Sequence, residues 1–513
     1  MNQLPTPIFL TVKEMLIMKI SNSFGRLDDL FVLSGKDLIG YVTDYDKLIP
    51  RTILEDIVSY LEDLNQPKLL ELYGLRRTGK TVLIFQSISY LLKRGISSED
   101  IIYIECNENN SIYQIIDLLK PRKFKYVFID EITYLNDFIS ASNILCTCCY
   151  GIKTVLTGTD SLSFNLADSK MFDRYVRIST TFISYKEWYK LKNGNTDITN
   201  YIHNGGILGN YKNTNTYINE SINSNIRNSL RNIVSFKSDY TYETLLSIVE
   251  LYPKLVIKVT ENFSNNFIRS LILRSLNSSL NEGLSKLYKG FPNRDKNTVN
   301  KVLTDMLQLD LNGFDIKQND LDILSCYLYD LDLYKKIERR TLKDNKIIIS
   351  YDNIQVQPVI RYSQYMEFLD ILEKKLNIFN NNKKDFENIF IPILEGKLLE
   401  QIVICNILKV YKEGYDVFSY RENDNAEIDL VIKNCNNNEC ILIEVKRAFN
   451  YKSKYHKWLI NEGVLENLNT YLGISNIKRK IVLYQGEDKF LENINVNYLN
   501  VEKFLLGIDS III

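Results

Sequence analysis

Short apolar runs separated by helix-length segments mark the chain between residues 51 and 200. Each run is long enough for a buried strand, and the segment after the first run repeats its apolar side chains with a helical period. Strands that alternate with helices in this way predict a doubly wound parallel sheet of the α/β class. The runs are Leu69–Leu72, Ile101–Ile104, Tyr126–Ile129 and Thr154–Leu156, and a further strand is expected over Tyr175–Phe182.

The flanking segments carry weaker patterns. Residues 1–50 mix short apolar runs with turns and contain no motif. A helical pattern with apolar residues at 53, 57 and 61 leads into the first strand, and we expect this helix to pack on the sheet.

The middle of the chain, from about 201 to 385, is mostly helical in period, with loops rich in Asn and Ser. Asp320–Ile337 predicts an amphipathic helix, and Lys346–Ser350 and Ile354–Ile360 predict two strands around a polar turn. Helices followed by a β-hairpin suit a winged-helix-like fold. Such folds bind DNA or partner proteins, or serve only as spacers, and no stripe of basic and aromatic residues decides between these roles.

From residue 386 the pattern of helices and strands begins again, in the order α-β-β-β-α-β. A chain of 513 residues is too long for one core. We therefore expect a lead-in (1–50), a first α/β domain (51–200), a middle region (201–385) and a second α/β domain (386–513). The expected elements of the last part are a helix around Leu394–Leu408, strands over Asp416–Tyr420, Glu427–Ile432 and Ile441–Lys446, a helix over Trp458–Leu472 and a strand over Lys480–Tyr484.

Composition narrows the class of protein only slightly. Lys and Arg number 63, as do Asp and Glu, so a nucleic-acid surface would have to be a local patch. No secretory signal opens the chain, and no apolar run reaches the ~18 residues of a spanning helix, so we expect a cytoplasmic protein without a membrane partner. Cys146, Cys148 and Cys149 lack a second ligand pair at zinc spacing and are expected to pack as reduced thiols.

The loop after the first strand carries the most specific motif of the chain. Gly74-Leu-Arg-Arg-Thr-Gly-Lys-Thr81 fits G-x-x-x-x-G-K-[ST] and lies between a strand and a helix, which is the setting that this motif requires. Gly74 and Gly79 allow a tight backbone that approaches a ligand closely. The loop amides, including those of Arg77 and Thr78, would form an anion cradle at the helix N-terminus. We expect Lys80 to reach the β- and γ-phosphates of ATP, and Thr81 to bind Mg²⁺.

Two carboxylates follow the third strand of the same region. Asp130 and Glu131 lie where parallel sheets bind ligands, at the carboxyl end of a buried strand. We expect Asp130 to take part in the Mg²⁺ shell and Glu131 to orient or polarise the water that attacks the γ-phosphate.

The turn and strand that follow offer further candidates. Thr159, in the turn Thr157-Gly-Thr-Asp-Ser161, is our choice for a side chain that senses the γ-phosphate, although a turn rich in hydroxyl groups is the simpler interpretation. Arg174 and Arg177 precede or lie in the last strand. Either of them stabilises phosphate charge in cis or in trans, or belongs to a solvated face.

These motifs resemble the prokaryotic AAA-type P-loop ATPase family that carries a C-terminal restriction-endonuclease-like domain. The resemblance rests on the loop at 74–81, YVFIDEI at 126–132, TGTDS at 157–161 and FISYKEW at 182–188. Family members usually carry Gly-Pro-Arg where this chain has Gly74-Leu75-Arg76, and Gly-Arg where it has Asp173-Arg174. The resemblance implies ATP hydrolysis, and AAA-type sites are often completed by an arginine from a neighbouring subunit of a homo-oligomer.

A second constellation lies in the C-terminal part. It resembles the PD-(D/E)XK nuclease core, because Asp429 is followed, after fourteen intervening residues, by Glu444-Val445-Lys446. Glu400 matches the acid on the first helix of that core. Carboxylates on adjacent strands suit a hard cation such as Mg²⁺ or Mn²⁺. The expected metal ligands are Glu400, Asp429 and Glu444, with Lys446 acting on the nucleophilic water.

The resemblance makes DNA the expected macromolecular substrate. Three alternatives stay open from the sequence. In the first, Glu444 and Lys446 form only an ion-paired edge. In the second, the protein is an ATP-gated DNA-binding switch that does not cleave. In the third, it is a signalling ATPase that binds partner proteins and uses the C-terminal fold as a scaffold.

Overall fold

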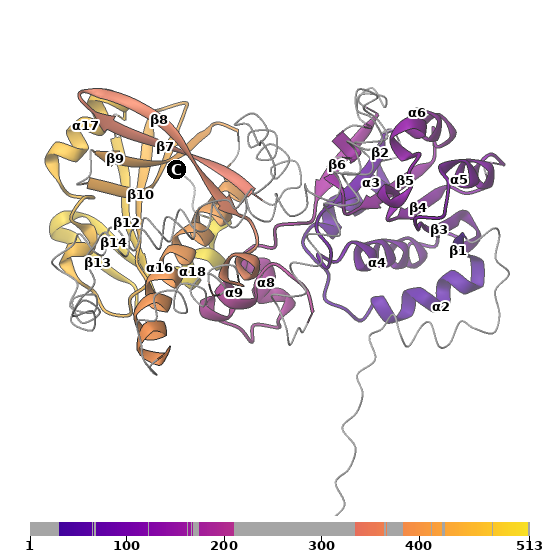
Figure 1. Cartoon of the computed structure of the whole chain (residues 1–513), viewed down its shortest axis with the longest axis horizontal. Helices are drawn as coiled ribbons and strands as arrows, with labels where there is room; N and C mark the ends of the chain where they lie inside the picture. The colour runs from indigo at the N-terminus through magenta and orange to yellow at the C-terminus, as the bar shows by residue number, and fades with distance from the viewer. Residues whose placement is uncertain are drawn as a thin grey trace, which may run out of the picture.

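The computed structural model describes residues 30–209, 334–363, 366 and 383–510, apart from short gaps at 64, 66–67, 122, 162, 166, 168–173, 412, 423–425 and 475. Two bodies, each built around one sheet, lie side by side (Figure 1). Within these ranges, no helix combines the length and the apolar character needed to cross a membrane.

The first body is the expected parallel sheet. Its strand order is β1-β3-β4-β5-β2-β6, and only the edge strand β1 runs antiparallel to its neighbour. The last strand is shorter than the sequence predicts, because it ends at Ser179 and not at Phe182. The strands are β1 (Phe31–Ser34), β2 (Leu69–Tyr73), β3 (Ile101–Glu105), β4 (Tyr126–Asp130), β5 (Lys153–Gly158) and β6 (Tyr175–Ser179).

Helices cover both faces of this sheet because the side chains of its strands alternate between two apolar clusters. Ile101 and Tyr103 of β3 pack with the side chains of α2, α3 and α4, while Ile102 and Ile104 pack with those of α5 and α6. Cys146 and Cys149 are buried in the second cluster, as expected for packed thiols. The helices are α2 (Gly35–Tyr45), α3 (Leu54–Glu62), α4 (Lys80–Lys93), α5 (Ile112–Leu119) and α6 (Phe138–Cys148), with short 3₁₀ turns at Ser98–Asp100 and Ile132–Tyr134.

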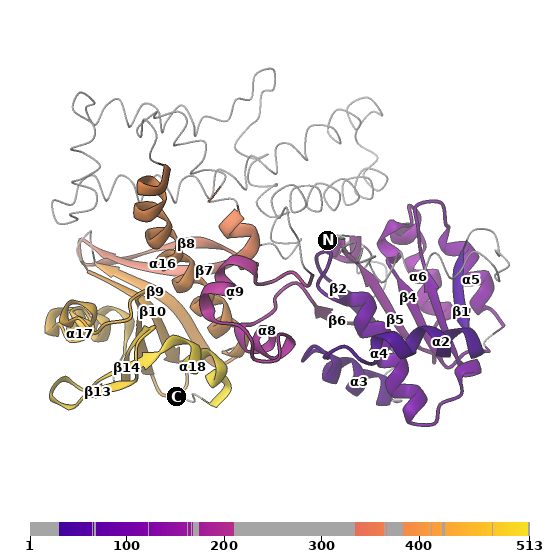
Figure 2. The ribbon, with the colours of Figure 1, turned by 90° about the horizontal axis from the view of Figure 1, so that it is seen from below.

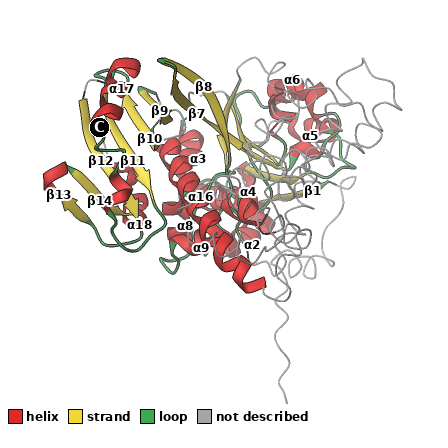
Figure 3. Cartoon of the chain, turned by 60° about the vertical axis from the view of Figure 1, so that its left-hand side comes forward, coloured by secondary structure: helices red, strands yellow, loops and turns green. Residues whose placement is uncertain are grey.

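The second body contains the predicted α-β-β-β-α-β order within a larger mixed sheet (Figure 3). Its strand order is β13-β14-β12-β11-β10-β9-β7-β8. The elements are β7 (Tyr334–Lys343), β8 (Lys346–Gln355), α16 (Lys383–Val410), β9 (Tyr415–Glu422), β10 (Ala426–Asn434), β11 (Glu439–Val445), α17 (Glu462–Leu472), β12 (Asn476–Tyr484), β13 (Lys489–Leu491), β14 (Val496–Asn500) and α18 (Val501–Leu506), with 3₁₀ turns at Ser453–His456, Glu492–Ile494 and Ile508–Ser510.

The strands predicted over Lys346–Ser350 and Ile354–Ile360 do not form a hairpin, because Lys346–Gln355 is one continuous strand, β8, and residues 358–363 are helical. β8 pairs instead with β7, and this hairpin is not the wing of a separate middle domain. β7 pairs in parallel with β9, so the hairpin completes an edge of the C-terminal sheet that would otherwise present unpaired backbone groups. The residues from Tyr334 to Ile337, which the sequence places in a helix, begin β7. The rest of that expected helix, at 320–333, and most of the expected winged-helix-like region lie outside the described residues.

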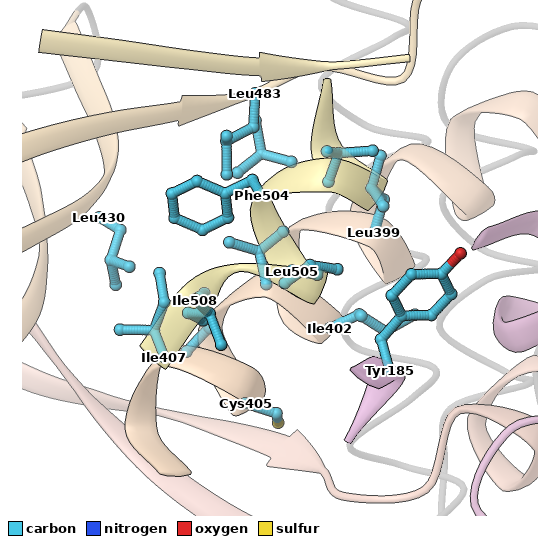
Figure 4. Packing of buried hydrophobic residues seen from close by; sticks show 14 of the residues in the cluster. Tyr185, Leu399, Ile402, Cys405, Ile407, Leu430, Leu483, Phe504, Leu505 and Ile508 are labelled. Atoms are coloured by element: carbon cyan, nitrogen blue, oxygen red, sulfur yellow. The ribbon is translucent and has the colours of Figure 1, made fainter. Parts of the chain in front are cut away.

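Two short helices join the bodies. α8 (Tyr185–Leu191) and α9 (Ile198–Asn204) follow β6 but contact the second body, where α8 packs with α18 and α9 with α16 (Figure 2). Tyr185 lies in one apolar cluster with residues from α16, α18 and the strands, including Ile402, Leu430 and Phe504 (Figure 4). The packing therefore assigns residues from about 182 to 207 to the C-terminal core, whereas the sequence places the boundary near 200.

Candidate functional site

The loop between β2 and α4 has a backbone that glycine permits at two positions. Gly74 has φ +149° and Gly79 has φ +91°, both in the region that L side chains rarely adopt. A Cβ atom on Gly74 would lie 2.3 Å from Thr180 Oγ1. Thr78 Oγ1 donates to Leu75 O at 2.9 Å and thereby closes the loop on itself.

Lys80, the first residue of α4, is buried in the loop. Its Nζ donates to the carbonyl oxygens of Gly74 at 2.9 Å and Leu75 at 3.1 Å, and lies 3.9 Å from Glu131 Oε1. Burial lowers the pKa of Lys80 below its ordinary value of 10.5, although Glu131 and Asp130 favour its charge. The ammonium is therefore held at the mouth of the loop, where a phosphate can replace its carbonyl partners.

Asp130, at the end of β4, is held by three hydroxyl groups. Its Oδ2 accepts from Thr81 Oγ1 at 2.7 Å and from Tyr103 OH at 3.1 Å, and its Oδ1 accepts from Thr157 Oγ1. A threonine hydroxyl and a carboxylate in contact are the oxygen donors that Mg²⁺ prefers, so these residues fit the ion. Sequence reasoning missed Tyr103 and Thr157. Only the pairing of β3 and β5 with the two edges of β4 could have indicated them.

Glu131 takes a left-handed conformation, with φ 56°, that turns the chain sharply after β4. Within the described part of the chain, its Oε2 is buried and has no hydrogen-bond partner. Burial raises the pKa of Glu131 above 4.5, although Lys80 opposes this rise. A carboxylate with one uncompensated buried oxygen is suited to accept a hydrogen bond or a proton from a ligand.

The other residues expected near the phosphates take different positions. Thr159 is buried just beyond β5, and it is Thr157 that contacts Asp130. Arg177 donates to buried Glu71 Oε2 at 2.8 and 3.1 Å, in the middle of the β2–β6 pair.

The arginines in and near the loop take separate positions. Arg174 lies beside Leu69, at the end of β2 opposite the loop, so it is not brought to the site in cis. Arg77 is exposed, whereas Arg76 donates to Tyr134 OH, and its charge favours the ionised form of Glu131.

In the second body, Asp429, Glu444 and Lys446 form a tight cluster. A bulge in β10 follows Ile428 and re-aims Asp429. Its Oδ2 accepts from the Val445 backbone N–H at 2.8 Å and lies 3.2 Å from Lys446 Nζ, which lies 2.5 Å from Glu444 Oε2. As expected from strand alternation, Ile443 and Val445 of β11 pack on the opposite side, against α16.

The pKa values of the two carboxylates in this cluster are shifted in opposite directions. Burial opposes the ionisation of Asp429, but the charge of Lys446 lowers its pKa below 3.8. Burial and the charge of Asp429 raise the pKa of Glu444 well above 4.5. Glu444 Oε1 is buried without a hydrogen-bond partner among the described residues. One carboxylate oxygen therefore remains for a cation or a hydrogen-bond donor.

Glu400 is not part of the same oxygen cluster. It pairs with Lys397 one turn earlier on α16, and burial raises its pKa to about 7. Glu427, which the sequence places on the same strand face as Asp429, pairs with Arg421 at 2.7 Å. Across the described ranges, no three His, Cys, Asp or Glu side chains form a ready-made metal site. Asp429 and Glu444 meet around Lys446, and Glu400 does not join them.

Comparison with known proteins finds partial likenesses only. An uncharacterized protein of Haemophilus influenzae is 31% identical over 151 residues, which is 26% of this chain and 37% of that relative. This chain thus spans little more than a third of the relative's length. The Walker-type ATPase of Pyrococcus abyssi is 14% identical, over 63% of this chain and 99% of that chain, with a TM-score of 0.29. The ORC2 protein of Aeropyrum pernix is 12% identical, over 65% and 98%, with a TM-score of 0.31. TM-scores of this size establish no shared overall fold.

Two family models match separate parts of the chain. Residues 395–504 match a domain of unknown function, DUF4143. Residues 66–189 match the AAA domain, and this match encloses the loop, Lys80, Asp130 and Glu131. Residues 66–189 are therefore similar to the AAA domain.

Proposed function

We propose that the protein binds ATP with Mg²⁺ at the loop of residues 74–81 and hydrolyses its γ-phosphate bond. The observation that carries this proposal is the convergence of Lys80, Thr81, Asp130 and Glu131 at one edge of the sheet. A loop, a buried ammonium and two carboxylates in this arrangement are the parts that phosphoryl transfer uses.

Each residue has a distinct role in the proposed reaction. The loop amides bind the phosphates, and Lys80 neutralises charge on the β- and γ-phosphates. Thr81 and Asp130 would hold Mg²⁺, which neutralises phosphate charge when it is bound. Glu131 orients the attacking water and accepts its proton, and its raised pKa makes it a better proton acceptor than an ordinary glutamate.

Two substitutions separate binding from turnover. Lys80→Ala should weaken nucleotide binding by about 100-fold or more, because an ammonium about 4 Å from phosphate charge contributes several kcal/mol in a partly buried site. Glu131→Gln should retain binding and lower kcat by about 10²–10⁴-fold, because an amide accepts no proton.

Titration with a fluorescent nucleotide measures binding, and the rate of phosphate release measures turnover. Lys93→Ala, at the exposed end of the same helix, is the matched control and should change neither quantity. Equal turnover in the wild type and in Glu131→Gln would remove Glu131 from the catalytic role.

A second candidate function, for the C-terminal body, is Mg²⁺- or Mn²⁺-dependent action on DNA. It is favoured by the cluster of Asp429, Glu444 and Lys446, and above all by the buried Glu444 Oε1 that lacks a partner in the described structure. Asp429 and Glu444 would hold the cation, which activates water and polarises a phosphodiester when it is bound. Lys446 would then be released to orient the nucleophile.

This second candidate is tested on the full chain by metal titration and by cleavage of labelled DNA, with and without ATP. Asp429→Ala and Glu444→Ala should each remove one class of divalent-metal sites and leave ATP binding unchanged. Asp488→Ala, which breaks an exposed pair with Lys503, is the control. DNA binding without cleavage in the wild type would instead favour an ATP-gated binding switch, and failure to bind DNA would favour a protein partner.

A further inference from the structure

Arg51 lies just before α3 and is 4% exposed. All five N–H groups of its guanidinium donate hydrogen bonds. Nη1 donates to Thr78 O and Thr180 O, each at 2.7 Å; Nη2 donates to Phe182 O and Glu187 Oε2, each at 3.2 Å; and Nε donates to Glu187 Oε1 at 2.9 Å. A buried arginine with every donor engaged fixes the positions of the groups around it.

One of these acceptors, Thr78 O, belongs to the nucleotide-binding loop. The preceding carbonyl, Arg77 O, accepts from the backbone N–H of Leu208 at 2.9 Å. The described peptide bonds contain no cis bond, and in a trans peptide the C=O and the next N–H point in opposite directions. Since Arg51 and Leu208 hold these two carbonyls on the outside of the loop, the N–H groups of Thr78 and Gly79 are directed toward its interior.

Glu187 and Leu208 tie this loop support to the segment that joins the two bodies. Glu187, the carboxylate partner of Arg51, lies on α8 and is 3.6 Å from Lys409 Nζ of α16. Leu208 follows α9, and Gln357 Nε2 donates to Thr181 O at 3.3 Å and to Gly206 O at 3.2 Å. A continuous set of polar contacts, buried except at the half-exposed Lys409, therefore runs from the nucleotide loop to the main helix of the C-terminal body.

We propose that Arg51 is a positioning residue of the nucleotide site, which orients the loop amides from behind and couples them through Glu187 to the C-terminal body. This inference rests on the proposed binding of ATP by the same loop. The amides need no reorganisation when the phosphates arrive, because folding of the joining segment has already fixed them. By reciprocity, nucleotide that tightens the loop stabilises the joining segment and the body packed on it.

The first test compares Arg51→Lys with the wild type and with Arg94→Lys, in the full chain. Lysine keeps the charge of Arg51 but can serve at most three of the five donor positions. We expect the Kd for a fluorescent ATP analogue and for ADP to rise about tenfold or more, with kcat at saturating ATP changed less. Arg94, on the exposed end of α4, pairs only with Glu62 among the described residues, and its variant should bind as the wild type does.

Unchanged Kd values in a folded Arg51→Lys protein, beside a wild type that binds, would overturn the inference and leave the ATP-binding proposal intact. A wild type that binds no nucleotide would overturn both. A purely structural role predicts a lower melting temperature with the same Kd at temperatures well below it, so thermal unfolding is followed on the same samples.

The second test uses Glu187→Gln, which leaves the three carbonyl contacts of Arg51 in place. Both tryptophans of the chain, Trp188 and Trp458, lie in the C-terminal body, so their fluorescence during urea unfolding reports that body. Saturating ADP should raise the urea midpoint in the wild type and raise it by less than half as much in Glu187→Gln. An equal shift in the two proteins, or no shift in a wild type that binds ADP, would contradict the coupling even if Arg51→Lys does not fold.

Discussion

Replacing Lys446 by methionine should strongly destabilise the C-terminal body. The ammonium lies 3.2 Å from Asp429 and 2.5 Å from Glu444, which are 7% and 3% exposed. Methionine keeps the apolar stem but leaves two buried carboxylates beside each other without their cation. Breaking a buried ion pair by removing one partner costs about 3–5 kcal/mol, which is a large share of the roughly 5–15 kcal/mol that stabilises a domain.

The pH dependence of this loss has a definite sign. Lys446 lowers the pKa of Asp429 below 3.8 in the folded wild type. The stability that this shift contributes is present above the unfolded pKa and is lost as the pH falls through the folded one. The methionine variant lacks this contribution, so its deficit should be largest near neutral pH and should shrink on acidification.

Urea unfolding followed by tryptophan fluorescence measures the loss directly. At slopes of about 1–3 kcal/mol/M, the deficit corresponds to a fall of roughly 1–5 M in the urea midpoint. Lys503→Met removes an exposed pair with Asp488 and should change the midpoint little, because surface pairs contribute about 0–1 kcal/mol.

Divalent metal distinguishes a structural ion pair from a cation site. If Mg²⁺ or Mn²⁺ binds between the two carboxylates, metal at about 100 times its Kd restores about 2.7 kcal/mol to the Lys446→Met protein. A Lys446→Met protein that unfolds at the wild-type urea concentration would refute the ion-pair reasoning. A deficit that metal does not reduce would leave the ion pair and contradict the cation site.

Three further predictions concern the first body. Arg177→Ala should cost about 3–5 kcal/mol of unfolding free energy, because buried Glu71 loses the charge of its guanidinium partner; a loss below about 1 kcal/mol, as expected for Arg94→Ala at the surface, would contradict this. Since burial raises the pKa of Glu131 and catalysis needs its ionised form, kcat should fall on acidification with a midpoint above pH 4.5; a midpoint at or below 4.5 would count against this base. If Arg174 acts in trans within a homo-oligomer, turnover per subunit should rise with protein concentration and Arg174→Ala should abolish the rise, whereas a concentration-independent rate in a monomeric sample would exclude it.

The sequence predicts best what is local. The strands around Asp130 and the loop at 74–81 follow from apolar runs and from a motif whose residues are adjacent in the chain, and the structure confirms both. The hairpin of β10 and β11, which turns between Cys435 and Cys440, is likewise local, because its turn residues lie between two adjacent strands that pair antiparallel.

What the sequence did not predict depends on contacts between distant segments. Arg51 meets Glu187 across 136 positions, and neither residue belongs to a recognisable motif. The pairing of β7 with β9 joins strands separated by a long stretch of chain, and a hairpin seen alone is equally compatible with a wing. Thr157 and Thr159 lie two residues apart in one hydroxyl-rich stretch, and only the geometry of β4 and β5 selects Thr157, inside β5, as the partner of Asp130.

The difference between neighbours in sequence and neighbours in space also bears on how the two bodies are related. α8 and α9 lie within or next to the matched AAA domain in sequence, yet their apolar faces are buried in the C-terminal core. If either helix moved away from the C-terminal body, its apolar face would be exposed. If α8 moved away from Arg51, buried Glu187 would lose its guanidinium partner. Both costs oppose separation of the joining segment from either body. A change in the nucleotide loop is therefore more readily absorbed as a shift of this segment with the C-terminal body than as a hinge between the two.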